Sequence, residues 1–533
     1  MKLAFVAFLL LVALPAGTAA AANTTIAPDG TILLDGKRVF PIVLAKGPEL
    51  DSTTPAGANG LDEVVSAGVN VFKTGPVSEP WLPADIQDGI AWNRAASARG
   101  ASTWVNLATL ADAKPGSLKE QRLREVVNAL EGDPSGSAVA LWKGADEPWW
   151  AKLQPSALQY AYCLGTSHRM PDWCADPADN GHLWVTIQAP RGTATDLAPY
   201  SDVTDIHGVD HYPVIFTDPD PDLHEVGVWT DRVRGITPNQ AVWTTLQVCA
   251  SGSSNPADPT QFVLPTRRQE RYLAYDALIN GARSLAFYGG NLDRCWNESD
   301  TAHGWNWTFW NGVLGDLVRE LSAGSAIAPA LVNPGTTKAL TSSDSTTQVI
   351  SREGSSPNDL WVIAARSGPD SQAVTVGGLP STVTTGTVYT EGRSIPVANG
   401  AFTDTFDRWD VHVYRFDATP PPPPPPPAPP PPAPPPAPPV VASRPPLAVR
   451  GLRLTQARHG RPFRVQLLVS NATEPRVSCS ARVGRKALRT ASRRWAAGTA
   501  SCMWRLPRTS RGKRVGGVVR VDGVWRRYAA RIR

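Results

Sequence analysis

Two acidic residues, Asp146 and Glu147, follow the predominantly apolar run Val139–Gly144 after a single alanine. Two tryptophans come within three residues of Glu147, and low polarity around a carboxyl group raises its pKa, so that it keeps its proton near neutral pH. A protonated carboxyl group can act as a general acid. Glu147 is therefore the first candidate for catalysis, against the simpler alternative of a surface glutamate or an ion-pair partner.

A second polar cluster contains His207, Asp210 and His211. Asp210 has the residue type needed for a second catalytic carboxylate, against the alternative of a structural aspartate in a loop. Together with Glu147, the cluster also has the residue types of a zinc site. On an extended strand, however, His207 and Asp210 would point to opposite faces. We therefore expect neither a metal nor a cofactor.

The elements that carry both clusters alternate regularly between β-branched runs and helix-like stretches over residues 36 to 322. Eight strands, each followed by a helix, have the size and order of a closed (β/α)₈ barrel. The alternative is an open doubly wound sheet, which is disfavoured because no glycine-rich loop follows the first strand. The predicted strands are Val39–Leu44, Val69–Lys73, Thr103–Leu107, Val139–Gly144, Leu183–Gln188, Thr204–Val209, Ala241–Gln247 and Ser284–Tyr288.

Polar residues gather at the carboxyl ends of these predicted strands, where barrel enzymes place their active sites. The opposite ends carry no comparable set. The predicted substrate-binding residues are Lys46, Lys73, Asn106, Asp146, Trp149, His211, Tyr212, Gln247 and Tyr288.

Three segments resemble clan A glycoside hydrolases. Asp146-Glu147-Pro148 is similar to their acid/base strand, and Asp29–Lys37 resembles their N-terminal hairpin. Trp409–Phe416 resembles the end of the β-domain that often packs against such barrels. The resemblance covers residues 29 to 417. It implies a (β/α)₈ glycosidase in which Glu147 protonates the glycosidic oxygen.

The chain departs from that pattern at two positions. Asp146 stands where an asparagine usually precedes the acid, and Gln247 stands where the seventh strand usually carries the nucleophilic glutamate. Because an amide is a poor nucleophile, either the strand register differs, another carboxylate serves, or the barrel no longer cleaves. Asp210 is the best replacement, and Asp146, Asp293 and Glu49 are weaker candidates.

Tryptophan, with 19 residues, is commoner than tyrosine with 10 or phenylalanine with 12. Indole faces stack on the apolar faces of sugar rings, so the tryptophans of strand-end loops favour a carbohydrate ligand. Core packing is the alternative for any single one. These tryptophans are Trp81, Trp149, Trp150, Trp296, Trp305 and Trp307.

The chain is modular. Residues 1–22 have the lone Lys2, the apolar run Leu3–Leu14 and the small residues of a secretory signal peptide. No later stretch is long and apolar enough to span a membrane. We expect a monomer that is secreted, extracellular or cell-wall associated. The predicted parts are a barrel at 23–330, a β-sandwich at 331–418, a stiff proline-rich linker at 419–446 and a β-rich module at 447–533.

The C-terminal module is very basic. From Arg444 onward the chain has 23 Lys and Arg residues and two acids, a charge of +21, and the remainder carries −16. Such a module should bind anionic cell-wall polymer in a salt-sensitive way, with no specific nucleic acid as partner. The alternative is a solvated domain whose arginines only aid solubility.

Six cysteines in an exported chain indicate disulfides. We expect pairs that are close in the sequence or in a closed barrel. The predicted bridges are Cys163–Cys174, Cys249–Cys295 and Cys479–Cys502.

These features together predict a secreted glycosidase that acts on a polysaccharide. A carbohydrate- or wall-binding protein on a degenerate barrel is the first alternative, and Gln247 favours it. The second is an adhesion or wall-structural protein in which the linker and the basic tail do the main work.

Overall fold

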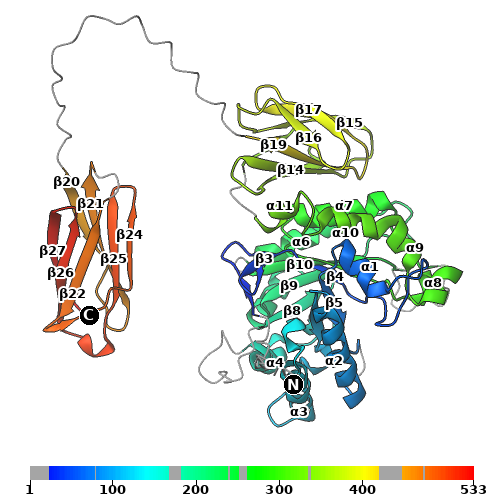
Figure 1. The fold of residues 1–533 in the computed structure, drawn as a ribbon, viewed down its shortest axis with the longest axis horizontal. Coiled ribbons are helices and arrows are strands. Elements are labelled where there is room, and N and C mark those ends of the chain that lie inside the picture. The colour runs from blue at the N-terminus through cyan, green and yellow to red at the C-terminus, as the bar shows by residue number, and fades with distance from the viewer. Residues whose placement is uncertain are drawn as a thin grey trace, which may run out of the picture. The chain divides into compact units, whose positions relative to one another are not determined.

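A computed structural model of the protein describes residues 23–77, 80–166, 182–237, 240–250, 261–333, 338–418, 447–471 and 475–533. The chain divides into two compact units, Met1–Pro422 and Pro423–Arg533. The first unit holds a barrel and a β-domain, and the second holds the C-terminal module (Figure 1). The predicted signal peptide, the predicted linker and Cys174 lie outside the described residues, so the Cys163–Cys174 bridge stays a prediction.

Eight strands close into a barrel in their sequence order. All neighbouring pairs are parallel, and pairing of the last strand with the first completes the closure. The predicted barrel is therefore confirmed, and the open doubly wound sheet is wrong. The strands are β4 (Ile42–Leu44), β5 (Val71–Thr74), β6 (Ser102–Asn106), β7 (Val139–Asp146), β8 (Leu183–Gln188), β9 (Ile206–Asp210), β10 (Ala241–Gln247) and β11 (Leu285–Tyr288).

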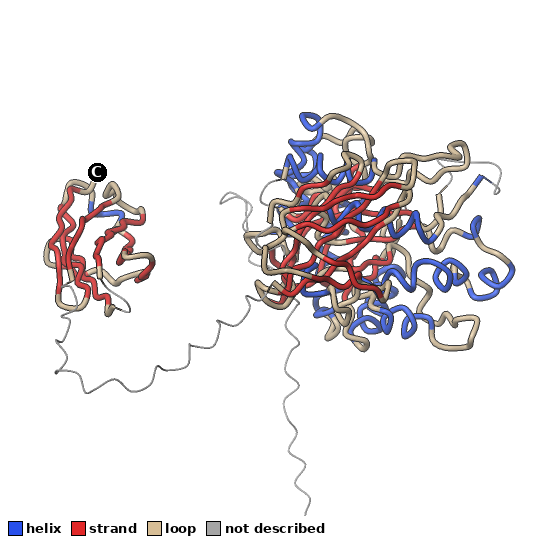
Figure 2. The backbone as a smooth tube through the Cα atoms, turned by 90° about the horizontal axis from the view of Figure 1, so that it is seen from above, coloured by secondary structure: helices blue, strands red, loops and turns tan. Residues whose placement is uncertain are grey.

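Helices lie outside the strands on several sides of this unit (Figure 2). Local capping explains several helix starts: the Ser117 side chain accepts a hydrogen bond from the Glu120 amide, and Thr266 with Gln269 forms a capping box. Within the described residues, no helix is both long and apolar enough to cross a bilayer. The helices are α1 (Gly60–Ala67), α2 (Pro83–Ser97), α3 (Leu118–Gly132), α4 (Pro155–Thr166), α5 (Ala194–Leu197), α6 (Glu225–Ile236), α7 (Arg267–Ile279), α8 (Glu298–His303), α9 (Trp307–Phe309), a π-helical turn (Trp310–Leu314), α10 (Gly315–Leu321) and α11 (Ala328–Val332).

A small antiparallel sheet closes the amino-terminal end of the barrel. It consists of β1 (Thr24–Ile26), β2 (Ile32–Leu34) and β3 (Lys37–Val39). Ile32 packs among the inward-facing residues of the barrel strands, and the Thr24 hydroxyl donates to the Ala140 carbonyl at 2.7 Å. The barrel is thus plugged at this end, which leaves the carboxyl-terminal rim for a ligand.

The domain after the barrel consists of two antiparallel sheets and packs on α7. The ring of Tyr272 contacts that of Trp409 at 4.8 Å, and Arg271 donates to the Val411 carbonyl. Alternating β-branched runs in the sequence predict five of this domain's strands, whereas β12, β17 and β18 lack such a run and are not predicted. The predicted runs are 347–351, 360–365, 373–376, 387–389 and 411–416. The sheets are β12 (Thr341–Ser342), β15 (Gln372–Gly377) and β18 (Ala401–Phe406), and β13 (Thr347–Glu353), β14 (Asp359–Arg366), β19 (Val411–Asp417), β16 (Thr385–Val388) and β17 (Arg393–Pro396).

The C-terminal unit is a second all-β module, also seen in Figure 2. Phe463 and Trp504 are buried in its core. The predicted bridge Cys479–Cys502 joins its two sheets, with Cα atoms 6.5 Å apart. The sheets are β20 (Ala448–Leu454), β21 (Pro462–Ser470), β25 (Thr499–Arg505) and β24 (Ser492–Ala496), and β23 (Lys486–Ala487), β22 (Val477–Val483), β26 (Arg514–Val521) and β27 (Val524–Arg531).

Candidate active site

A pocket of about 230 Å³ opens at the carboxyl-terminal rim of the barrel. Drug-sized ligands fill sites of about 300–1,000 Å³, so this pocket suits a single sugar ring. Its walls come from β5, β6, β7, β8, β9, β10 and β11, the turns after them, and the residue that follows β4. The lining residues are Ala45, Lys73, Val77, Trp104, Lys143, Asp146, Glu147, Ile187, Asp210, Tyr212, Thr245 and Tyr288.

The end of β7 is bent so that two acids meet the pocket. The pairing of β7 with β8 shifts register between Lys143 and Asp146. A Cβ at Gly144 would lie 1.8 Å from the Trp184 ring nitrogen, so only glycine fits this bend. Glu147 then adopts a φ of +44° and donates its amide to the Ile187 carbonyl at 2.7 Å. A left-handed non-glycine residue costs about 1–3 kcal/mol, and such strain clusters at functional sites.

Asp146 is held in its ionised form. Its side chain is 53% exposed, and its Oδ1 forms an ion pair of 2.5 Å with the buried Lys143 ammonium. Desolvation acts to raise the pKa of Asp146, but the charges of Lys143 and Lys73 outweigh it and bring that pKa below its usual value. The pocket therefore holds one fixed negative charge.

Glu147 and Asp210 both retain their protons more strongly than ordinary carboxyl groups. Burial, followed by the charge of Asp146, raises the pKa of Glu147. Burial, followed by the charges of Glu147 and Asp146, raises the pKa of Asp210 well above its usual value. Asp210 Oδ2 accepts a hydrogen bond of 3.3 Å from the Tyr212 hydroxyl, and within the described part of the chain its Oδ1 has no hydrogen-bond partner. Both carboxyl groups are thus better proton donors to a bound molecule than exposed carboxyl groups would be at the same pH.

Lys73 of β5 is the second buried cation of the pocket. The residue is 7% exposed, and its ammonium lies 5.8 Å from the centre of the Trp104 ring. Burial, and then the charge of Lys143, lowers the pKa of Lys73 to about 7. Among the residues that the structure describes, none forms a hydrogen bond or an ion pair with this ammonium.

Tyr212 and Tyr288 form an aromatic wall. Their rings stack with centres 5.7 Å apart and planes at 16°. Burial, together with the nearby carboxylates, raises the pKa of both phenols. Both side chains therefore stay neutral and can donate hydrogen bonds to sugar hydroxyls.

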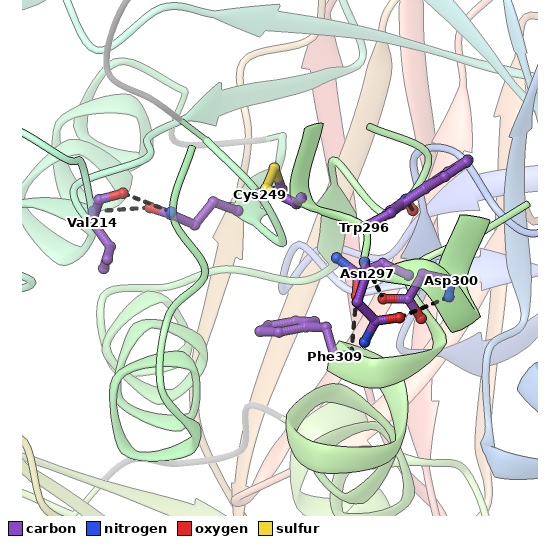
Figure 3. The surroundings of a disulfide bond; sticks show 10 residues. Val214, Cys249, Trp296, Asn297, Asp300 and Phe309 are labelled. Carbon is purple, nitrogen blue, oxygen red and sulfur yellow. Dashed lines mark hydrogen bonds between the residues drawn. A yellow bond between two sulfur atoms is a disulfide. The ribbon is translucent and has the colours of Figure 1, made fainter. Parts of the chain in front are cut away.

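Gln247 lies away from the pocket and fastens the loop after β9. Its amide oxygen accepts from the Val214 amide at 2.9 Å, and its amide nitrogen donates to the Val214 carbonyl at 2.8 Å. Figure 3 shows these two bonds to Val214, with Cys249 close by. The predicted Cys249–Cys295 bridge is present, with Cα atoms 6.3 Å apart, and joins the segments after β10 and β11.

The other predicted substrate-binding residues lie just outside the pocket lining. Asn106 donates to the Val77 carbonyl at 3.2 Å, so it positions a lining residue. His211 turns to α6 and meets Glu225 at 3.0 Å. The Lys46 carbonyl accepts from the Trp305 ring nitrogen at 3.0 Å. The weaker acid candidates, Asp293 and Glu49, are exposed and also lie outside the lining.

The geometry does not assemble the zinc alternative. His207 is fully buried on the outer side of β9, where its ring meets the Ser201 hydroxyl at 3.5 Å. Burial lowers the pKa of His207 to about 4. Across the described ranges, no three His, Cys, Asp or Glu side chains are grouped in a way that would hold a metal ion.

A second hollow of about 780 Å³ lies over the segment that follows Glu147. Trp149 and Trp150 line it, and Trp150 is 52% exposed. The guanidinium of Arg191 lies 4.1 Å from the centre of the Trp150 ring. The ring of Trp149 packs on Gly192, where a Cβ would come within 3.2 Å of it. Of the predicted loop tryptophans, Trp150 is exposed, whereas Trp81, Trp305 and Trp307 are buried.

The sequence analysis missed Lys143, Trp104 and Thr245 as pocket residues. One signal was available for Lys143, because a lysine inside the apolar run Val139–Gly144 has to reach a carboxylate or a cavity when the strand is buried. Trp104 and Thr245 were indistinguishable from core residues.

No family model and no curated protein matches the chain. A search of solved structures finds similar chains, among them an alpha-amylase from Geobacillus thermoleovorans complexed with acarbose, with 10% identity, 71% of this chain and 98% of that chain covered, and a TM-score of 0.40. An alpha-amylase from H. orenii has 10% identity, coverages of 71% and 99%, and a TM-score of 0.42. A GH42 beta-galactosidase from G. stearothermophilus has 9% identity, coverages of 67% and 95%, and a TM-score of 0.41. Similarity this low says nothing of what this chain binds or cleaves, and its barrel fold is established by its own strand pairing.

Proposed function

We propose that the protein is a secreted clan A type glycoside hydrolase that cleaves a polysaccharide. The carrying observation is the convergence of Glu147 and Asp210 on one ring-sized pocket, where burial raises the pKa of Glu147 as a proton donor requires. Glycoside hydrolysis requires two carboxyl groups, one protonated and one ionised. The strained backbone of Glu147 is a further sign that its position serves function before stability.

In the proposed reaction, Glu147 transfers its proton to the glycosidic oxygen while the bond from the anomeric carbon to that oxygen breaks. Asp210, as the carboxylate, then either bonds to the anomeric carbon or takes a proton from the attacking water. The Tyr212 hydroxyl stabilises the ionised form of Asp210 by donating to it. Asp146 remains charged, and its repulsion keeps the proton on Glu147 until the leaving oxygen accepts it.

Asp210 replaces the glutamate that clan A enzymes carry on the next strand. Gln247 stands at that place in β10, but both ends of its amide are used by Val214. Asp210 of β9 reaches the pocket from the neighbouring strand, since Thr245 of β10 pairs in register with it. A second carboxylate can therefore be supplied without a glutamate at position 247.

A polymer fits this site better than a small glycoside. The pocket has room for one ring, and the hollow lined by Trp149 and Trp150 offers indole faces for further sugars. We propose that residues 1–22 direct the chain out of the cell, that it acts as a monomer, and that the basic module holds it on anionic cell-wall polymer.

The test is hydrolysis of a broad panel of polysaccharides by the wild type and by Glu147→Gln and Asp210→Asn. We expect each variant to lose about 10²–10⁴-fold in rate, the usual contribution of general acid-base catalysis. Activated aryl glycosides should suffer less from Glu147→Gln because their leaving group needs little protonation. Glu49→Gln is the matched control, since it makes the same change on an exposed loop and should leave the rate unchanged.

The second candidate is a carbohydrate-binding protein on a barrel that no longer cleaves, favoured by Gln247. It predicts that the wild type hydrolyses nothing on the panel and that both carboxylate variants bind glycan as the wild type does. That combined result would exclude the enzyme.

A further inference from the structure

Lys73 and Lys143 line the same pocket with different partners. Lys143 is satisfied by Asp146 at 2.5 Å, whereas Lys73 has no partner among the described residues. A buried ammonium without a partner is costly, and natural proteins usually pair it. The chain therefore keeps an unpaired lysine, which is free to take up a proton, inside the space where a sugar ring would bind.

A neutral sugar would leave this cation without a counterion. Sugar hydroxyls can accept a hydrogen bond from an ammonium group, but they carry no charge to compensate its burial. A carboxylate does both, and charge-assisted hydrogen bonds are about twice as strong as neutral ones. The Trp104 ring beneath the ammonium supplies only its π face, at 5.8 Å.

The position of Lys73 also suits the recognition of one substituent on a ring. Lys73 belongs to β5, and Asp210 belongs to β9, which is the fourth strand further round the closed barrel. A ring that fills the pocket would thus have Lys73 on one side and the proposed catalytic carboxylate on the other. The titratable residues that face Lys73 are Lys46, Lys143, Asp146 and Asp210; of the two acids, only Asp146 is held ionised, and it is already paired with Lys143.

We propose that Lys73 binds the carboxylate of a uronic acid residue, so that the substrate is an acidic polysaccharide. This inference rests on the proposed glycosidase function and names the substrate class of that site. The very basic C-terminal module agrees with it, because its +21 charge would retain an acidic polymer and not a neutral one.

The experiment is calorimetric titration of the full-length protein with glucuronate, galacturonate, glucose and galactose, which are not themselves cleaved. We expect one uronate to bind about ten- to a hundredfold more tightly than its neutral counterpart, the range of a hydrogen bond to a charged group. Lys73→Met keeps a stem over Trp104 and removes the charge, and should abolish this preference while leaving the neutral sugar unaffected. Lys114→Met, on an exposed loop, is the control and should change nothing.

A second readout is the uptake of a proton on binding. The pKa of Lys73 lies at about 7 in the free protein, and a bound carboxylate would raise it. Uronate binding at pH 8 should therefore take up close to one proton and be about fivefold weaker than at pH 7. Calorimetry in two buffers of different ionisation enthalpy measures this uptake, and Lys73→Met should remove it.

Any one of four results overturns the proposal. The wild type binds uronate and neutral sugar with equal affinity, or Lys73→Met weakens the binding of uronate and of neutral sugar by the same factor. Alternatively, uronate binding takes up no proton, or glucose 6-sulfate binds more tightly than glucuronate. Failure of the parent function looks different. A wild type that binds uronate through Lys73 but hydrolyses nothing refutes the glycosidase and keeps the Lys73 site. If the wild type hydrolyses only neutral glycans, and Lys73→Met hydrolyses them equally well, the glycosidase function stands and the Lys73 site is refuted.

Discussion

In the barrel pocket, Lys73 and Lys143 are buried beside three carboxyl groups, whereas the arginines of the sheet formed by β23, β22, β26 and β27 lie at the surface of their module. On that sheet, Arg514 of β26 stands directly opposite Arg531 of β27. The described part of the module has one acidic side chain, Asp522, which accepts from the Arg476 amide. Carboxyl groups thus lie beside the cations of the first region, even though only Lys143 forms an ion pair there, and they are nearly absent around the cations of the second.

This difference separates two kinds of recognition. Buried charges are screened little by salt and act on a ligand group that fits one position. Exposed charges are screened strongly and attract any polymer of opposite sign. The pocket therefore suits selection of one sugar residue, and the arginine face suits retention of a long chain. The arginine face consists of Arg482, Arg514, Arg520, Arg527 and Arg531, which alternate with core residues along β22, β26 and β27.

The largest effect is expected from neutralising the arginine face. Five exposed charges at about 0.2–1 kcal/mol each predict a loss of about five- to five-thousandfold in binding at low salt when all five are changed to Gln. Retention of the full-length protein on polygalacturonate measures it, and raising the salt should weaken the wild type towards the variant. Deletion of residues 440–533 should abolish retention and leave hydrolysis of soluble substrate unchanged.

A second set of arginine substitutions tests whether the position of the arginines matters or only the net charge of the module. Arg453, Arg464, Arg494 and Arg505 are exposed on the other sheet of the module. If their replacement by Gln weakens binding as much per charge, the module acts through its total charge and the arginine face has no special role.

A smaller effect, on stability, is expected from Gln247→Glu. A carboxylate can accept from the Val214 amide but cannot donate to the Val214 carbonyl, so a buried acceptor loses its partner at a cost of about 1–3 kcal/mol. Burial would raise the pKa of the new glutamate, and only its protonated form can donate. The loss of stability should therefore be small at low pH and grow as the pH rises above about 4.3, the ordinary glutamate value.

Urea unfolding of the barrel at several pH values measures the Gln247→Glu effect. Gln247→Met, which breaks both bonds and does not titrate, should be destabilised at every pH. If Gln247→Glu instead hydrolyses substrate faster than the wild type, with stability unchanged, the barrel descends from a retaining glycosidase that has lost its nucleophilic glutamate.

The barrel was predictable because each strand is an apolar run set apart by an amphipathic helix. β8 and β10 begin and end at the predicted residues. Strands of the two β-domains were missed where exposure weakens the pattern: β27 carries Trp525, Arg526 and Arg527 in succession, all exposed. Such a strand is specified by its pairing partner, which local sequence does not reveal.

The sequence predicted at which end of the barrel the candidate site lies, but not how its residues are arranged there. Strand ends identified Lys73, Asp146, Glu147 and Asp210, all of which line the pocket. The bend at Gly144 depends on the Trp184 ring from the neighbouring strand, 40 positions further along the chain. The role of Gln247 likewise depends on a loop 33 residues away. Contacts of this range leave no local pattern.

The smallest effect concerns the directly opposed pair Arg514 and Arg531, which sharpens the comparison between the two regions. Like charges directly opposite in a sheet destabilise it, and an opposite pair contributes about 0.2–1 kcal/mol. Arg531→Glu should therefore raise the thermal unfolding temperature of the module slightly while it weakens retention on polygalacturonate. Arg485→Glu changes the net charge equally in the turn between β22 and β23, so the difference between the two variants isolates the pair. If Arg531→Glu gains no more stability than Arg485→Glu, the opposed arginines cost the fold nothing, and their arrangement is no evidence that the face is kept for an anionic partner.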